Sequence, residues 1–198
     1  MTAVGVNTQI GYADTDNATR LAVLDRLAAA GVEWLLLDVG WVTPEEQSGQ
    51  FVALYLATLD FIVDAALTRN MQVLVVINGT PTWASPTTSG PPSTPGLASS
   101  FAQRLAGHFR DRVGAYETWN EPNNAAFWSG TLDQFATLHT EMASGIRAGD
   151  PAATVVLAGP AYCDSDWVEQ MLLRDLSGTF DALGVHPYMS PSNLPPSA

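Results

Sequence analysis

The sequence has few basic residues and a single cysteine. Its 198 residues include eight Lys and Arg against twenty Asp and Glu, which gives a formal net charge of −12. Nucleic acids and anionic membrane surfaces attract basic proteins, so this balance argues against both as partners. Because Cys163 is alone, a disulfide within the chain is excluded, and the redox compartment stays open.

Long apolar runs and phosphate-binding loops are also missing. No uninterrupted apolar stretch approaches the ~20 residues of a membrane span, and residues 1–5 carry neither the basic segment nor the apolar core of a signal peptide. No Gly-x-Gly-x-x-Gly or Walker-type loop follows a predicted strand, which disfavours a nucleotide-binding doubly wound sheet. The three histidines are too dispersed for a metal site, and we expect neither a metal nor a cofactor.

What the sequence contains is a regular alternation of apolar runs and amphipathic segments. The predicted strands are 4–10, 34–39, 73–77, a segment that ends at Glu121, 154–158 and 182–186. The predicted helices lie between Asp16 and Gly31, over 51–69, around 101–109, around 135–146 and over 167–176. The run 34–39 is almost continuously apolar, as in a parallel strand that is buried on both faces.

Six units of this kind in a row predict a parallel α/β architecture. Polar and aromatic side chains follow the strands, at the end where barrel enzymes build their sites. We therefore predict a (β/α)8 TIM-barrel type, in a single domain that covers 1–198. A complete barrel typically needs about 250 residues. We expect only about six βα units in this chain, with the last two lacking.

The most informative stretch is 116–123, Tyr-Glu-Thr-Trp-Asn-Glu-Pro-Asn. A carboxyl group among a Trp and two amides suits carbohydrate chemistry, because the aromatic ring can stack on a sugar and the acid can protonate a glycosidic oxygen. The alternative is a turn that ends a strand and contains an incidental acid. On the residues alone, both interpretations stay open.

The segment Trp119-Asn120-Glu121-Pro122 resembles the strand-four motif of clan A glycoside hydrolases, which are (β/α)8 barrels. Its flanks make it most similar to family 39, which contains xylosidases and iduronidases, and to bacterial exopolysaccharide hydrolases. The resemblance implies that Glu121 is the general acid/base and that Asn120 binds the 2-hydroxyl of the sugar. We expect Trp119 to contact the substrate, and Trp119 and Trp128 to provide the apolar surroundings that favour a protonated acid.

A second motif, His186-Pro187-Tyr188, resembles the strand-six motif of the same clan. The resemblance implies that His186 and Tyr188 lie near the nucleophile and bind in the substrate cleft, although a lone His at a strand end is more often structural. Tyr162 is a further candidate for sugar stacking. His108 and His139 are expected on helix surfaces or edges, without a role.

The segments that follow strands two and three resemble the substrate cleft of the family. They contribute Asp38, Trp41 and Trp83, and Trp128 is a candidate stacking platform, although a buried aromatic is the commoner explanation. Clan members commonly carry an Arg two residues before the matching Asp. Here that position is Leu36, which removes a group that helps to position the nucleophile.

The resemblance also implies a second carboxyl group, since retaining hydrolysis needs a nucleophile as well as an acid. In the family this is a Glu at the end of strand seven, and the sequence ends at Ala198, in the loop after strand six. We expect the nucleophile to be absent from this chain. The local acids Asp38, Asp164, Asp166 and Glu169 are not favoured as substitutes.

Three functions follow from these observations. The first is a retaining glycoside hydrolase that acts on a polysaccharide or glycoside, and the second is a degenerate barrel that binds carbohydrate without cleaving it, as a structural component of a virion or cell surface. The third, a nucleotide-dependent enzyme, lacks a phosphate loop. A six-stranded barrel exposes its edges, so a second chain or larger assembly is expected to cover them. We expect an extracellular, virion-associated or cell-surface location.

Overall fold

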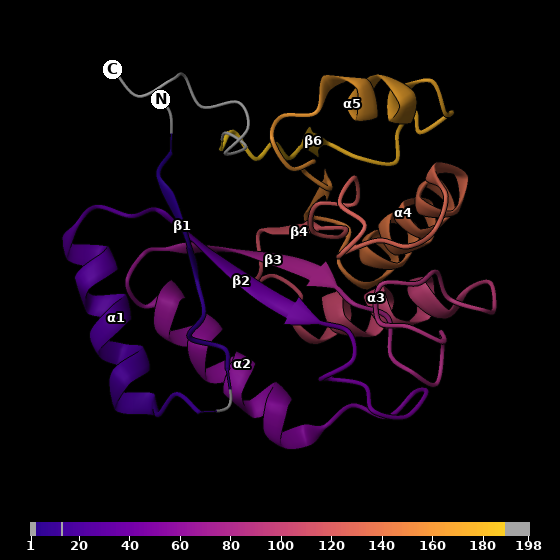
Figure 1. The fold of residues 1–198 in the computed structure, drawn as a ribbon. Helices are drawn as coiled ribbons and strands as arrows, with labels where there is room; N and C mark the ends of the chain where they lie inside the picture. Colours follow the sequence, from indigo (N-terminus) through magenta and orange to yellow (C-terminus); the bar gives the residue numbers. More distant parts are fainter. Residues whose placement is uncertain (1–2, 13, 189–198) are drawn as a thin grey trace, which may run out of the picture.

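The computed structural model describes residues 3–12 and 14–188. These residues form one sheet of six parallel strands in the order β1-β2-β3-β4-β5-β6 (Figure 1). The strands are Gly5–Thr8 (β1), Trp34–Gly40 (β2), Gln72–Asn78 (β3), Ala115–Glu117 (β4), Thr154–Leu157 (β5) and Ala182–Leu183 (β6). The helices are Asn17–Ala29 (α1), Ala53–Leu67 (α2), Leu97–His108 (α3), Leu132–Gly149 (α4) and Ser165–Leu172 (α5).

The two faces of the sheet differ, and β2 shows the difference most clearly. Leu35, Leu37 and Val39 are at most 1% exposed, whereas the alternate residues Leu36 and Asp38 are half-buried. Successive side chains of a strand point to opposite faces. The helices therefore pack on one face of the sheet and form the core with it. The other face corresponds to the inside of a barrel that six strands leave incomplete, and we call it the inner face.

The register aligns polar residues on the inner face. Asp38 of β2 pairs with Val76 of β3, and Val76 pairs with Glu117 of β4. Glu117 in turn pairs with Val156 of β5. Since residues paired between parallel strands point to the same side, Asp38 and Glu117 share the inner face in one row, two strands apart.

Local sequence explains where α1 and α4 begin. The carboxylate of Asp16 accepts the backbone N–H of Thr19 and caps α1. At the start of α4, Thr131 and Gln134 form a capping box in which each side chain accepts the other's backbone N–H. Such caps satisfy backbone donors that have no partner inside the helix.

The predicted arrangement of six parallel strands alternating with helices is confirmed, while several boundaries differ. The fourth strand ends at Glu117, four residues before Glu121, because the chain bends there. β6 is confined to Ala182–Leu183, and α5 ends at Leu172. His139 was expected on a helix surface, but it is fully buried, because its face of α4 packs against the sheet.

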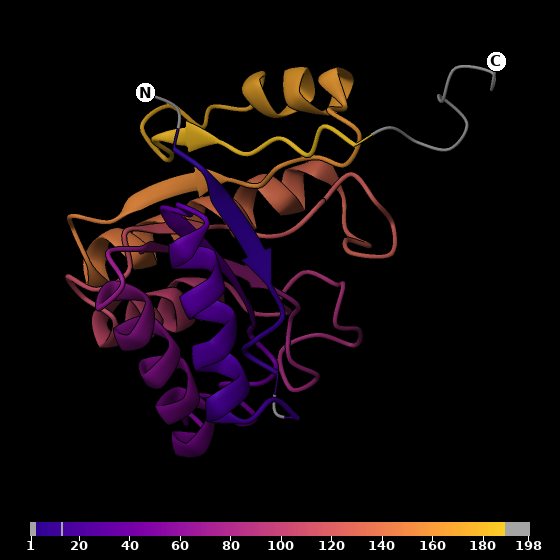
Figure 2. The same ribbon diagram turned by 90° about the vertical axis from the view of Figure 1, so that its left-hand side faces the viewer.

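The sheet ends in β1 on one side and β6 on the other. Within the described residues, β1 pairs only with β2 and β6 only with β5. In Figure 2, β6 lies between β5 and α5 at one end of the molecule, while α1 and α2 lie toward the other end. None of the helices in the described ranges is both long and apolar enough to cross a membrane.

Candidate active site

Glu121 lies on a bend that follows β4. Trp119 has a φ of 126° and Glu121 a φ of 48°, values that residues with a side chain rarely adopt. The turn closes where the N–H of Asn124 donates to the carbonyl oxygen of Glu121 at 2.9 Å. Glu121 is 8% exposed, so the bend turns its carboxyl group away from bulk water. Backbone strain of this kind is concentrated at functional sites.

The carboxyl group of Glu121 contacts His186. The Nδ1 atom of His186 lies 2.8 Å from Oε1 of Glu121, which is the distance of a hydrogen bond. His186 follows β6 and forms a β-bridge with Ala161, which follows β5. The structure therefore brings together the two motif residues that lie 65 positions apart in the sequence. An imidazole and a carboxyl group in contact can share one proton, which suits acid–base chemistry.

Trp119 and Trp128 lie behind this bend, in the core. Their rings meet edge to face at 5.4 Å, and they are 1% and 4% exposed. Each indole N–H donates to a backbone oxygen, that of Phe127 and that of Thr131. The two rings pack against the bend from the core side, and neither has an exposed face on which a sugar could stack. The substrate contact predicted for them does not fit their position.

Trp41 is also a core residue, and Trp83 is half-buried beside it. The ring of Trp41 stacks on Phe101 at 5.0 Å, and it has no exposed surface. Buried Glu45 fixes both tryptophans, because its carboxylate accepts the Trp41 N–H at 2.6 Å and its carbonyl oxygen accepts the Trp83 N–H at 2.9 Å. Arg104 forms an ion pair with the same carboxylate. Stacking on a sugar remains a prediction for Trp83 and does not fit Trp41.

The remaining predicted site residues are more exposed than the buried tryptophans Trp41, Trp119 and Trp128. Asn120 is half-buried between Trp119 and Glu121. Tyr188 is 47% exposed, and its ring lies 5.9 Å from that of His186. Asp38 is half-buried on the inner face, and burial raises the pKa of its carboxyl group, an effect that neighbouring Asn7 and His186 oppose. Substrate binding by Asn120, Asp38, His186 and Tyr188 remains a prediction.

Sequence reasoning missed three residues that shape this site. Glu117, on the inner face, accepts the N–H of Gly159 at 2.8 Å. Asn123 donates to and accepts from the backbone of Ala161, at 3.1 and 2.8 Å, and so joins the loops after β4 and β5. His139 contacts Thr118 at 2.6 Å. Glu117 and Asn123 belong to the 116–123 stretch, which was the available sequence signal, whereas His139 carried none.

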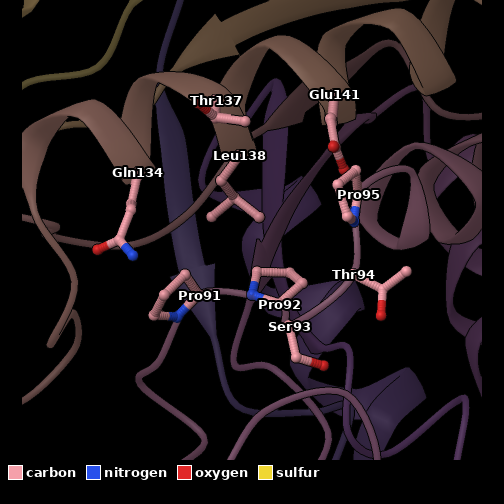
Figure 3. A pocket seen from close by; sticks show the side chains of 9 residues that line it. All are labelled: Pro91, Pro92, Ser93, Thr94, Pro95, Gln134, Thr137, Leu138 and Glu141. Atoms are coloured by element: carbon pink, nitrogen blue, oxygen red, sulfur yellow. The ribbon is translucent and has the colours of Figure 1, made fainter.

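Two hollows lie against α4, and Glu121 lines neither of them. One has a volume of about 210 Å³ and is formed by the proline-rich loop after β3 and by α4 (Figure 3). Its lining consists of Pro91, Pro92, Ser93, Thr94, Pro95, Gln134, Thr137, Leu138 and Glu141. The inner face around Glu121 is open instead, since six strands cannot enclose a cavity as a closed barrel does. Among the described residues, no group of three or more His, Cys, Asp or Glu could hold a metal ion.

Residues 2–190 match the model of the cellulase family, glycosyl hydrolase family 5. No curated protein is similar enough in sequence to match the chain. The predicted resemblance to clan A is confirmed. The matching family model is that of family 5, while family 39 occurs among the similar structures.

Solved structures share the fold at low sequence identity. A family 39 glycoside hydrolase from the gut symbiont Bacteroides cellulosilyticus aligns with a TM-score of 0.72 and 22% identity, over 95% of this chain and 38% of its own. A family 5 enzyme from Streptomyces cattleya, in complex with Manβ1-4GlcNAc, gives 0.65 and 17%, over 79% and 44%. An exo-β-1,4-mannosidase from an Opitutaceae bacterium gives 0.64 and 18%, over 79% and 32%. The chain thus spans less than half the length of each.

Proposed function

The chain belongs to the cellulase family, glycosyl hydrolase family 5, and from this premise we propose that it contributes to the hydrolysis of O-glycosidic bonds in a polysaccharide or glycoside. In this proposal Glu121 is the general acid/base of a retaining double displacement. The observation that carries it is the contact between the buried Glu121 carboxyl group and His186 at 2.8 Å. This contact supports the proposal, because Glu121 and His186 follow the carboxyl ends of β4 and β6, and barrel enzymes build their sites at that end of the strands.

The roles of the two groups follow from their contact. In the first step, a protonated Glu121 gives its proton to the glycosidic oxygen as the bond to the sugar breaks. In the second step, the carboxylate takes a proton from the attacking water. His186 fixes the orientation of this carboxyl group throughout. In this proposal Asn120, which precedes Glu121, holds the 2-hydroxyl of the sugar, and that hydrogen bond strengthens in the transition state.

A retaining mechanism needs a nucleophile about 5 Å from the acid. Asp38 and Glu117 are the carboxyl groups on the inner face, and burial raises the pKa of both. The resemblance to clan A implies a nucleophile at the end of strand seven, a position that neither residue occupies. We therefore assign the nucleophile to neither, and propose that it comes from a chain segment beyond the described residues or from a partner.

The names of the similar structures suggest substrates for a first test. One is a complex with Manβ1-4GlcNAc, another is an exo-β-1,4-mannosidase, and the family model is that of cellulases. We propose a β-linked hexoside or its polymer as the substrate class. Aryl β-mannosides, aryl β-glucosides and β-1,4-linked oligosaccharides are the probes that distinguish these sugars.

The acid role is tested by Glu121→Gln, which keeps the size of the side chain and removes its transferable proton. We expect turnover of a β-1,4-linked oligosaccharide to fall by about 10²- to 10⁴-fold, because general acid catalysis contributes that much. Turnover of a dinitrophenyl glycoside should fall less, since its leaving group needs little protonation. Glu33→Gln, at an exposed position before β2, is the matched control. Unchanged oligosaccharide turnover in Glu121→Gln would refute the role.

The second candidate is a carbohydrate-binding protein without hydrolytic activity. Two observations favour it: Leu36 stands on the inner face where clan members carry an Arg, and the nucleophile is unassigned. In that case neither the unmodified protein nor Glu121→Gln turns over any glycoside, even when the segment or partner that would supply the nucleophile is present, while both bind the same oligosaccharide in calorimetry. We also propose that a second chain or a larger assembly covers the edges at β1 and β6.

A further inference from the structure

Glu117 is a buried carboxyl group without a role in the proposed reaction. It is the last residue of β4, and it is 5% exposed. Oε1 of Glu117 accepts the backbone N–H of Gly159, just after β5, at 2.8 Å. Burial raises the pKa of Glu117, opposed by this N–H and by the nearby imidazole of His186, while Asp38 adds to the rise. Because burying an acid costs free energy, the position calls for an explanation.

Two glycines enclose this carboxyl group. A Cβ atom at Gly184 would lie 2.6 Å from Oε1 of Glu117, and one at Gly159 would lie 2.9 Å from Cδ2 of His186. Real Cβ contacts are longer than both distances. The absence of side chains at these two positions lets the Glu117 carboxyl group, the two glycine backbones and the His186 ring pack in direct succession.

The same segment also holds His186 by its backbone. The N–H of His186 donates to the carbonyl oxygen of Pro160 at 3.3 Å, and the N–H of Cys163 donates to that of His186 at 3.1 Å. The segment 159–163 is therefore anchored by Glu117 at its start and pairs with His186 along its length. At the other side of the ring, Nδ1 of His186 lies 2.8 Å from Glu121.

We propose that Glu117 is a positioning residue that sets the ring of His186 against Glu121. By accepting the Gly159 N–H, its carboxyl group fixes the segment after β5, and this segment places the ring. The effect of Glu117 on catalysis rests on the proposed role of Glu121. The effect of Glu117 on the position of the His186 ring does not, because the position of an imidazole can be measured without turnover.

The test uses the imidazole nitrogen signals of the purified chain, recorded by two-dimensional ¹H–¹⁵N NMR. The protein contains only three histidines, so each ring can be assigned by substitution. In Glu117→Ala we expect the His186 ring nitrogens to lose their hydrogen-bonded shifts and to move toward those of a free imidazole. The rings of His108 and His139 should keep theirs, which reports an intact fold. Glu33→Ala is the matched control for loss of an acid.

Two further variants separate positioning from a general loss of structure. Glu117→Gln keeps an oxygen that can accept the Gly159 N–H, so it should restore the His186 signals to those of the unmodified protein. Gly184→Ala removes no polar group but places a Cβ atom 2.6 Å from Oε1 of Glu117 and 2.8 Å from the nitrogen of Gly159, so it disrupts the contact between them and should shift the His186 signals alone. If Glu117→Ala does not fold, Gly184→Ala decides the question.

Unaltered His186 signals in Glu117→Ala or in folded Gly184→Ala would overturn the inference. So would a Glu117→Gln protein that behaves as the Ala variant does. These results are distinct from a failure of the proposed function. If Glu121→Gln keeps full turnover while Glu117→Ala displaces the ring, the proposed acid is wrong and the positioning contact stands. If Glu121→Gln loses turnover while the His186 signals stay unchanged in the Glu117 variants, the proposed acid stands and the positioning role of Glu117 is wrong.

Discussion

At the scale of single residues, His139 connects α4 to the segment that carries Glu121. Its Nδ1 lies 2.6 Å from the hydroxyl of Thr118, the residue after β4, and its Nε2 lies 3.0 Å from the hydroxyl of Thr179. The ring is fully buried. Burial, and to a lesser extent the charge of Arg147, lowers its pKa to about 4. The neutral ring therefore belongs to the folded state, and protonation favours unfolding.

This pKa predicts a loss of stability in acid. An unfolded His titrates near pH 6.5, so the contribution of His139 is complete above that pH and is lost as the pH falls toward about 4. The free energy of unfolding should fall by up to about 3 kcal/mol over this window. Denaturant titrations at several pH values measure it.

The matched comparison for this prediction is between two histidine variants. His139→Gln should be less stable at pH 7 but lose less stability between pH 6.5 and 4, whereas His108→Gln, at the surface against Asp60, should keep the full slope. Asp38 and Glu117 contribute with the opposite sign, because their raised pKa values favour folding in acid. Equal slopes in the two variants would contradict the assignment to His139.

At the scale of elements, the contact between α3 and α4 depends on two glycines. A Cβ atom at Gly145 would overlap the carbonyl oxygen of Ser99, and one at Gly149 would overlap that of Gln103. The glycines lie four residues apart on α4, and so they present one bare face to α3. This close approach places α4, and with it His139, behind the Glu121 bend.

Gly145→Ala tests this contact, because in an exposed helix the same change would be favourable. Alanine is preferred over glycine by up to about 1 kcal/mol in helices. Here we expect a net loss of about 1 to 3 kcal/mol in the free energy of unfolding, since a methyl group in a filled contact forces the backbones apart. Ser144→Ala, at the neighbouring exposed position, is the control. A stabilised Gly145→Ala protein would show that the helices can separate at no cost.

At the scale of the whole molecule, the sheet formed by the described residues has two open edges, and none of these residues closes its inner face. Near these edges Val4 is 55% exposed and Val185 53% exposed. An unpaired strand presents its backbone N–H and C=O groups to any chain that can pair with it. These exposed edges motivate the proposal that a further segment or a partner covers them.

We expect the chain alone to associate as its concentration rises. Val185→Lys places a charge beside the β6 edge and should shift sedimentation velocity profiles toward the monomer, because charged residues at an edge oppose pairing. Leu54→Lys replaces the most exposed large hydrophobic residue, at 81% on α2, and should leave association unchanged. If the two variants behave alike, general surface hydrophobicity explains the association. A chain that is monomeric at all concentrations contradicts the prediction.

Much of the fold could be predicted because its signals are local. The apolar runs that became β2 and β3, and the stripes of the helices between them, are readable from residues close in sequence. The prediction was less accurate for β6, where a strand over 182–186 was expected and only the two residues Ala182–Leu183 form one. It placed Glu121 at a strand end because the bend at Trp119 depends on a φ that the sequence pattern does not reveal.

The sequence by itself determined the parallel α/β class, the number of strands and the candidate acid, because hydrophobic periodicity and a compact motif are properties of neighbouring residues. Only the tertiary structure decided that Trp119 and Trp128 support the site from the core, and that Glu117 and His139 lie beside it. Strand register and helix packing bring these side chains together across long stretches of chain. Burial and charge contacts arise from that assembly, so they set the chemistry of each group only after the chain has folded.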